Sequence, residues 1–296
     1  MHSIETLARV DVLCVDKTGT ITEEKMSVIE TFPPVNKTDD SESSTLCKYI
    51  HTLQDDNITM EALKKHFTEE GSLPATSTQP FSSKYKYSSV TTSYCQYRLG
   101  APEYLLTREQ LQANMHLIEL RTSLGKRVLA FAQYKEGVCI PLLFITLENK
   151  IRDNAIEIFS YFHDRNVEVK VISGDNPLTV SKVATTAGIA NADKYIDATT
   201  LTTPESIQDA VTKYTVFGRV KPEQKQLLVT ALQKNKLKVA MTGDGVNDIL
   251  AMKKADCSIA MGSGSDAARQ AAQVVLLDSD FSHLKNIVSE GRRDIN

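Results

Sequence analysis

Residues 10–20 read VDVLCVDKTGT, and the change from apolar to polar character after Val15 points to the architecture. The six residues that end at Val15 are mostly apolar and rich in valine, which predicts a buried strand. Asp16 then stands at the carboxyl end of this strand, and Gly19 marks the turn that follows. Because ligands of open α/β sheets bind at the carboxyl ends of the strands, Asp16 is a candidate site residue.

The second half of the chain repeats this strand pattern. Short apolar runs at residues 168–172, 215–218, 238–242 and 257–260 are each followed by an amphipathic segment. Such alternation predicts βαβ units, in which helices cover both faces of a parallel sheet. We therefore predict an α/β fold with a doubly wound parallel sheet.

Residues 25–141 follow a different pattern, with polar loops, two modest helices and alternating segments such as residues 85–97. Alternation of this kind is typical of antiparallel strands with one buried face. No crossover helix and partner strand follow residues 10–15 closely, so the partners of that strand come later in the chain. We predict an inserted α+β domain built on an antiparallel sheet, with residues 1–24 and 142–296 forming the α/β domain around it.

The composition excludes several classes of protein. The 296 residues are enough for two domains, and 34 Lys and Arg against 37 Asp and Glu give a net charge of −3, which offers no basic surface for nucleic acid. The five cysteines are scattered without a CxxC spacing, which is typical of reduced thiols in the cytosol. The apolar runs fall short of the roughly 20 residues that a membrane helix needs. We expect a monomeric chain that, as given, spans no membrane.

Polar segments follow three later strands as well, at residues 173–175 (SGD), 219–225 and 242–248 (TGDGVND). Since the carboxyl ends of parallel strands meet at one edge of a sheet, we expect these segments to form one site with Asp16. The residue types fit phosphoryl transfer to a carboxylate, with Asp16 as the nucleophile and Mg²⁺ held by Asp16 and Asp244.

The other polar groups have clear uses in such a site. The Ser173 hydroxyl and the Gly174 amide would hold phosphoryl oxygens, and the Lys225 ammonium would neutralise charge that develops in the transition state. Asp248 would add negative charge beside Asp244. The glycines allow the backbone to approach a phosphate closely.

The motifs DKTGT at residues 16–20 and TGDGVND at residues 242–248, separated by a large insert, resemble those of the P-type ATPases, cation pumps of the haloacid dehalogenase superfamily. The resemblance implies a phosphorylation (P) domain around an inserted nucleotide-binding (N) domain. It also implies that ATP phosphorylates Asp16 and that Mg²⁺ is bound by Asp16, Asp244 and the Thr18 main-chain carbonyl. The other positions that match the family's catalytic motifs are Lys17, Thr20, Ser173, Gly174, Asp175, Lys225, Asn247 and Asp248.

The resemblance also implies a set of nucleotide contacts. The matching positions are Phe81 and Lys86 near adenine, Gly100 and Ala101 in a GAPE segment similar to the family's KGAPE loop, and Arg127 and Arg152 toward ATP phosphate and ribose. The chain departs from the family pattern at Leu99, where many pumps have the KGAPE lysine, at Ser173, where threonine is usual, and at Asn149, where aspartate is usual. Without that lysine the adenine pocket loses a cationic wall, so we expect the nucleotide to bind more weakly or in a different pose.

The resemblance places the chain as the cytoplasmic part of a membrane pump, whose actuator and transmembrane domains would be its partners. The KGAPE-like loop and the absence of a His-Pro dipeptide favour a calcium or light-cation pump over a heavy-metal pump. One alternative is a phosphatase of the same superfamily with a cap domain, which Thr18 disfavours because these phosphatases carry an acid/base aspartate two residues after the nucleophile. Another is a regulatory nucleotide-binding module with a relict site, which the intact Asp16, Lys225 and Asp244 disfavour.

Overall fold

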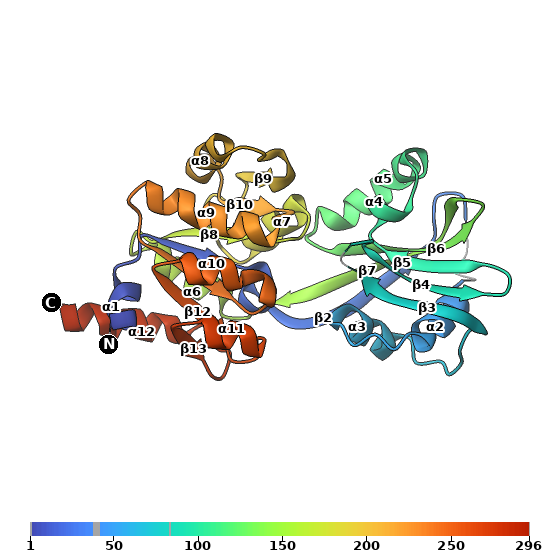
Figure 1. Cartoon of the computed structure of the whole chain (residues 1–296), viewed down its shortest axis with the longest axis horizontal. Helices are drawn as coiled ribbons and strands as arrows, with labels where there is room; N and C mark the ends of the chain where they lie inside the picture. The colour runs from blue at the N-terminus through green and yellow to red at the C-terminus, as the bar shows by residue number, and fades with distance from the viewer. Residues whose placement is uncertain (1, 38–41, 83, 296) are drawn as a thin grey trace. The chain divides into compact units, whose positions relative to one another are not determined.

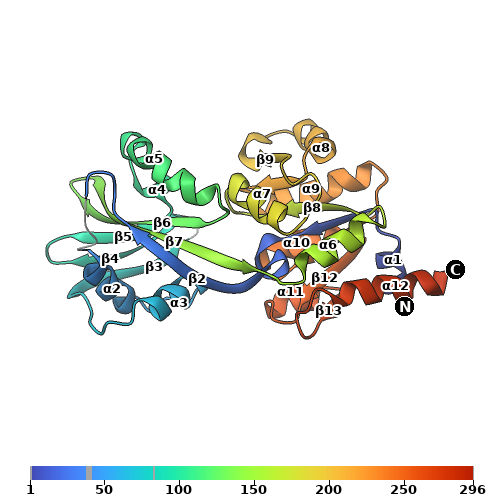
Figure 2. The same cartoon turned by 180° about the vertical axis from the view of Figure 1, so that it is seen from behind.

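The computed structural model describes residues 2–37, 42–82 and 84–295, which form two compact units (Figure 1). Unit 1 consists of the chain up to Glu23 and from Ile151 onward, and unit 2 consists of Glu24–Lys150. The chain passes between the units twice, along β2 (Thr22–Phe32) and along β7 (Val138–Ile151) (Figure 2). Within the described residues, no helix has the length and apolar character needed to cross a membrane.

Unit 1 is built on a parallel sheet of seven strands in the order β13-β12-β11-β1-β8-β10-β9. The strands are β1 (Val12–Val15), β8 (Glu168–Ile172), β9 (Tyr195–Asp197), β10 (Val216–Gly218), β11 (Val239–Gly243), β12 (Cys257–Met261) and β13 (Val274–Leu276). The doubly wound sheet predicted from the sequence is confirmed. Because β1 lies between β8 and β11, the strand order reverses on either side of it, and Asp16 follows β1 at the point where open α/β sheets bind ligands.

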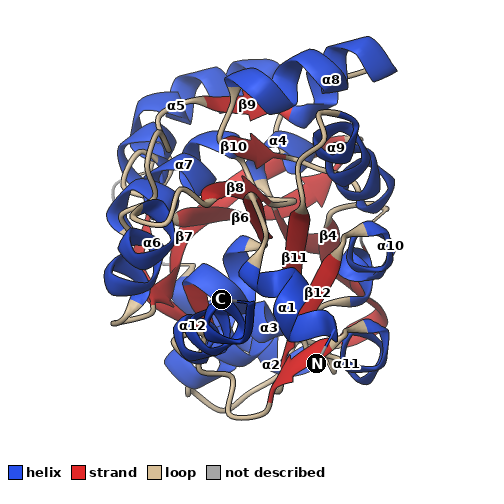
Figure 3. Ribbon diagram, turned by 90° about the vertical axis from the view of Figure 1, so that its left-hand side faces the viewer, coloured by secondary structure: helices blue, strands red, loops and turns tan. Residues whose placement is uncertain are grey.

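Helices cover both faces of this sheet (Figure 3). One face packs against α1 (His2–Ala8), α6 (Ala155–His163), α7 (Pro177–Thr186) and α12 (His283–Ile295), and the other against α8 (Pro204–Lys213), α9 (Pro222–Lys234), α10 (Ile249–Lys254) and α11 (Asp266–Ala271). Side chains alternate along β1 accordingly, with Leu13 and Val15 in the first core and Val12 and Cys14 in the second. All four are buried, so β1 is fixed from both sides.

Unit 2 contains a six-stranded sheet in the order β2-β7-β6-β5-β4-β3, whose ladders from β3 to β7 are antiparallel. The remaining strands are β3 (Ala75–Ser82), β4 (Tyr87–Thr92), β5 (Gln96–Gly100) and β6 (Arg127–Lys135). One face packs against α2 (Ser43–Thr52) and α3 (Ile58–His66), and the other against α4 (Pro102–Leu105) and α5 (Arg108–Thr122). The described part of this unit thus holds four helices, two more than the sequence pattern predicted.

The second crossing between the units lies later than expected. The sequence pattern predicted this crossing after residue 141, whereas the compact units divide between Lys150 and Ile151. The reason is that β7 continues without a break and pairs with β6 as far as Leu147. Leu143 and Ile145 are fully buried in the core of unit 2, so this apolar run belongs to the inserted sheet.

Candidate active site

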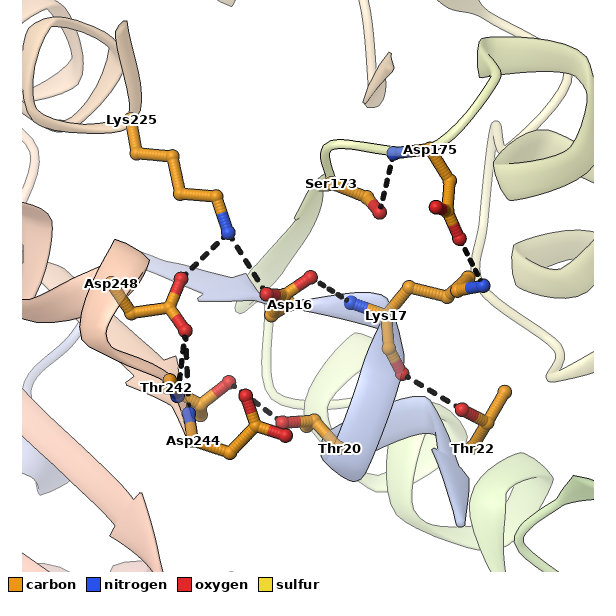
Figure 4. A network of polar contacts seen from close by, with 11 residues as sticks. Asp16, Lys17, Thr20, Thr22, Ser173, Asp175, Lys225, Thr242, Asp244 and Asp248 are labelled. Carbon is orange, nitrogen blue, oxygen red and sulfur yellow. Dashed lines mark hydrogen bonds and ion pairs between the residues drawn. The ribbon is translucent and has the colours of Figure 1, made fainter. Parts of the chain in front are cut away.

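The loops after β1, β8, β10 and β11 line one pocket of about 160 Å³ at the carboxyl edge of the unit 1 sheet. Figure 4 shows the polar network in and beside it. The pocket brings together nine predicted residues, namely Asp16, Thr18, Ser173, Gly174, Asp175, Lys225, Asp244, Asn247 and Asp248. Val220, Pro222 and Gly245 complete the lining. Segments more than 200 residues apart in the chain therefore meet at one site, as the strand-end pattern predicted.

An ammonium lies between two carboxylates at the centre of the pocket. Lys225 Nζ donates to Asp16 Oδ2 at 2.8 Å and to Asp248 Oδ1 at 2.6 Å (Figure 4). Lys225 stands in the first turn of α9, where Pro222 at the helix start directs that turn toward the strand end. The side chain of Lys225 is only 4% exposed, so its charge is compensated by these carboxylates and not by water.

Burial and the neighbouring opposite charges shift the pKa values of Lys225 and Asp16 in opposite directions. Burial by itself lowers the pKa of Lys225, but Asp16 and Asp248 outweigh it and hold that pKa above its ordinary value. Burial raises the pKa of Asp16; Lys225 opposes this rise only in part, and Asp248 adds to it. The ammonium is therefore charged at neutral pH, and a further cation at this site would favour the ionised form of Asp16.

Asp248 also shapes the TGDGVND loop. Its Oδ2 accepts hydrogen bonds from the backbone amides of Asp244, at 3.3 Å, and Gly245, at 3.2 Å. One carboxylate thus closes the turn and also pairs with Lys225. The sequence predicted a charge and a motif position for Asp248 but not this bond, because a contact from its side chain to the backbone of its own loop cannot be read from the motif letters.

The donor set fits a magnesium ion. One carboxylate oxygen from each of Asp16, Asp244 and Asp248 lies within 4.8 Å of the others. These carboxylates supply the hard oxygen ligands that Mg²⁺ prefers. Asp16 and Asp244 would hold the ion together with the Thr18 carbonyl that the resemblance implies.

The turn Lys17–Ile21 (η1) packs tightly against the end of β11. Gly19 has φ +74°, and a Cβ at this position would lie 2.0 Å from Asp244 Oδ2. Only glycine therefore combines this backbone conformation with such a close approach to the carboxylate. The buried hydroxyls of Thr20 and Thr242 lie 3.3 Å apart and join the same two segments.

The β8 loop is connected to the turn after Asp16 by a second ion pair. The Lys17 ammonium pairs with Asp175, and the Asp175 amide donates to Ser173 Oγ at 3.3 Å. The amide of Lys17 donates to Asp16 Oδ1 at 2.6 Å. Lys17 is buried and its charge is compensated by Asp175, so this lysine orders the pocket wall and leaves Lys225 as the ammonium beside Asp16.

Four of the predicted nucleotide contacts lie together at one end of the unit 2 sheet. Phe81 is on β3 and 44% exposed, and Lys86 follows in the turn to β4. Gly100 ends β5, where a Cβ would lie 2.4 Å from the Lys86 carbonyl oxygen, and Ala101 follows it as the N-cap of α4. Ser83, inside this segment, lies outside the described residues. Leu99 is 3% exposed and packs in the core.

The two arginines expected at the nucleotide lie in different units. Arg127 begins β6 and is exposed, on the strand that pairs with β5. Arg152 belongs to unit 1, where its Nη2 donates to the Gly19 carbonyl at 2.7 Å. The structure thus describes the two arginines in separate units.

A family model described as haloacid dehalogenase-like hydrolase matches residues 10–256, most of the chain. The chain belongs to this family. It is 40% identical over its whole length to probable cation-transporting ATPase exp7 of Streptococcus pneumoniae, of which it covers 39%. It is likewise 40% identical to calcium-transporting ATPase CtpE of Mycobacterium tuberculosis, again over its whole length and over 38% of that relative.

A solved structure of a zinc-transporting PIB-type ATPase in its E2.Pi state matches 99% of this chain and 42% of the solved chain, with a TM-score of 0.64 and 22% identity, and so shows the same fold. The two curated relatives confirm the resemblance to P-type cation-transporting ATPases. The chain spans about two fifths of the length of these relatives.

Proposed function

We propose that this chain is the catalytic region of an ATP-driven cation pump and that Asp16 takes the γ-phosphoryl group of ATP. An oxygen of Asp16 forms a bond to the γ-phosphorus, the bond from that phosphorus to the β–γ bridging oxygen breaks, and ADP leaves with the electron pair. The observation that carries the proposal is the position of the Asp16 carboxylate, which lies at the end of the central strand beside the Lys225 ammonium and within reach of two more aspartates.

The surrounding groups have separate parts in this reaction. The Lys225 ammonium lies 2.8 Å from the attacking carboxylate and would stabilise the negative charge that develops on the transferred oxygens. Ser173 and Gly174 line the same pocket and would hold two phosphoryl oxygens, while Asn247 lines it next to Asp248 in the chain. When bound, Mg²⁺ supplies positive charge that offsets the repulsion between the carboxylates and the phosphate.

Thr18 accounts for the persistence of the intermediate. It lines the pocket two residues after the nucleophile, where the phosphatases of the superfamily carry their acid/base aspartate. A threonine hydroxyl does not accept a proton from water at neutral pH, so the aspartyl phosphate would hydrolyse slowly without outside help. A slow step suits a pump that changes conformation before it releases phosphate, and argues against the phosphatase alternative.

In this proposal unit 2 binds the nucleotide. Phe81 offers an exposed aromatic face for adenine, and Lys86 offers a cation at the same end of the sheet. Gly100 and Ala101 provide close backbone approach next to that turn, and Arg127 would reach the phosphates. The buried Leu99 stands where many pumps have the KGAPE lysine, so moderate affinity for nucleotide is expected.

We further propose calcium as the transported ion, with actuator and transmembrane domains as the partners of the complete pump in a cell membrane. The support is that relatives named calcium-transporting ATPase are 40% identical over the whole chain, whereas the zinc-transporting structure is 22% identical and supports the fold alone.

Incubation with γ-³²P-labelled ATP and Mg²⁺ tests the proposed nucleophile. The wild type should acquire label that is stable in acid and released by hydroxylamine, as an acyl phosphate is. Asp16→Asn should lose at least about 99% of it, because an amide oxygen is a poor nucleophile and its phosphorylated product is unstable. Asp11→Asn, an exposed position before β1, is the matched control and should label like the wild type. Equal labelling of wild type and Asp16→Asn would remove Asp16 from its role.

A further inference from the structure

Arg152 is held differently from what a nucleotide contact requires. It follows directly after β7, and its Nη2 donates to the Gly19 carbonyl oxygen at 2.7 Å. Its backbone amide donates to the Ile21 carbonyl oxygen at 3.1 Å. Both acceptors belong to the turn that follows Asp16. The side chain and the main chain of Arg152 therefore both attach to the nucleophile's turn.

The surroundings of Arg152 also disfavour an anionic ligand. Arg152 lines a cavity of about 270 Å³ together with four carboxylates, from Glu23, Asp153, Asp278 and Asp280. This acidic lining would repel the phosphates of a nucleotide. Its Nε is buried and has no hydrogen-bond partner among the described residues, so the inner edge of the guanidinium is enclosed by protein.

The turn that Arg152 holds is the one that meets the magnesium ligands. Gly19 is so close to Asp244 that a Cβ would lie 2.0 Å from the carboxylate oxygen Oδ2. The Thr18 carbonyl is one residue before the carbonyl that Arg152 binds. A shift of this turn would therefore move one expected ligand and change the room available to another.

We propose that Arg152 is a positioning residue, which fixes the Gly19 carbonyl and thereby holds Asp244 and the Thr18 carbonyl in the arrangement that binds Mg²⁺. It acts from outside the metal site and does not touch the nucleotide. The proposal deepens the proposed function and rests on it, because the Mg²⁺ site belongs to the phosphoryl-transfer site. Residues that orient metal ligands in this way typically change metal affinity 10- to 100-fold when they are replaced.

The experiment measures Mg²⁺ binding and nucleotide binding independently of each other. Mg²⁺ binding to the full chain is measured by calorimetry and by the Mg²⁺ concentration that half-saturates uptake of beryllium fluoride, a mimic of the phosphoryl group, in ¹⁹F NMR. ADP affinity is measured without Mg²⁺. Arg152→Met keeps the side-chain length but removes the donors, and should raise the half-saturating Mg²⁺ concentration about 10- to 100-fold while ADP affinity stays within about twofold. Arg152→Lys keeps one donor and should recover part of the loss.

Arg127→Met is the matched control. It should weaken ADP binding about tenfold and leave the Mg²⁺ dependence unchanged, since Arg127 begins a strand of unit 2. The proposal is overturned if Arg152→Met weakens ADP binding as Arg127→Met does and leaves the Mg²⁺ dependence as in the wild type.

Two further outcomes are also decisive. Where circular dichroism shows that Arg152→Met is unfolded, Arg152→Lys decides alone. A half-saturating Mg²⁺ concentration raised about threefold or more with ADP binding intact supports the proposal, and an unchanged value contradicts it. If the wild type takes up no beryllium fluoride at any Mg²⁺ concentration, the proposed phosphorylation fails, and the calorimetric Mg²⁺ affinities of wild type and variants still judge the role of Arg152.

Discussion

Lys225→Met should slow phosphoryl transfer strongly and weaken the fold. The ammonium of Lys225 is the cation that lies within hydrogen-bond distance of both Asp16 and Asp248. Its loss removes a donor to the transferred group, which should lower the rate of phosphoenzyme formation about 10²- to 10³-fold. It also leaves the buried Asp248 carboxylate and the partly exposed Asp16 carboxylate without their shared counter-charge, which should cost about 3–5 kcal/mol in the free energy of unfolding.

The loss of folding stability in Lys225→Met should depend on pH in a definite direction. The pKa of Asp16 is already raised in the folded state, mainly by burial, so folding favours the protonated carboxyl. The stability that this proton contributes is present at low pH and is lost as the pH rises through the folded pKa. Removing Lys225 takes away a group that lowers the pKa of Asp16, so the deficit of Lys225→Met should be larger at pH 8 than at pH 5.

Urea denaturation at the two pH values measures this deficit, and acid-quenched labelling measures the rate. Lys234→Met, an exposed position on the same helix α9, is the control and should match the wild type in both assays. A Lys225→Met chain that forms phosphoenzyme at the rate of the wild type would show that the ammonium has no part in the transfer. A deficit that grows toward acid pH would show that the carboxylates are not what it stabilises.

Gly19→Ala should disable the metal site with a smaller effect on the fold. A Cβ at this position would overlap Asp244 Oδ2, and φ +74° is strained for alanine. The backbone strain should cost about 1–2 kcal/mol in the free energy of unfolding. The displaced carboxylate should lower Mg²⁺ affinity by at least about tenfold. Calorimetric titration of the variant with Mg²⁺ measures the second effect directly.

Gly137→Ala is a control that separates the effect of backbone strain from the effect of overlap with Asp244. Gly137 also has a positive φ, of +88°, but a Cβ there would meet nothing within 4 Å. This variant should show a loss of about 1–2 kcal/mol in stability and normal Mg²⁺ binding. If Gly19→Ala binds Mg²⁺ as the wild type does, then Asp244 is not a ligand held by this turn.

The strands at the centre of unit 1 could be predicted because each is an apolar run bounded by turn residues. The edge strands β9 and β13 were missed because both are short and partly exposed, with Tyr195 on β9 41% exposed, whereas the equally short β10 is fully buried. Apolar character alone could not show which unit a strand joins. For this reason the run around Leu143 was assigned to the wrong side of the second crossing.

The candidate site, too, could be predicted from the sequence only in part. Its members could be predicted because strand ends converge on one edge of a parallel sheet, whatever their distance along the chain. The contacts that order the site could not. The pairing of Lys17 with Asp175 and the bond from Arg152 to the Gly19 carbonyl each join residues more than 100 positions apart, and no local pattern encodes which partner a buried side chain selects.

Chemical trapping of the phosphorylated residue tests the central claim most directly. An acyl phosphate is reduced by borohydride to an alcohol, so a phosphorylated aspartate becomes homoserine, which mass spectrometry of proteolytic peptides can locate. After incubation with ATP and Mg²⁺, we predict homoserine at position 16 of the chain and at no other aspartate. Homoserine at Asp244 or Asp248 with an unmodified Asp16, or phosphate recovered only on a serine or threonine, would contradict the account.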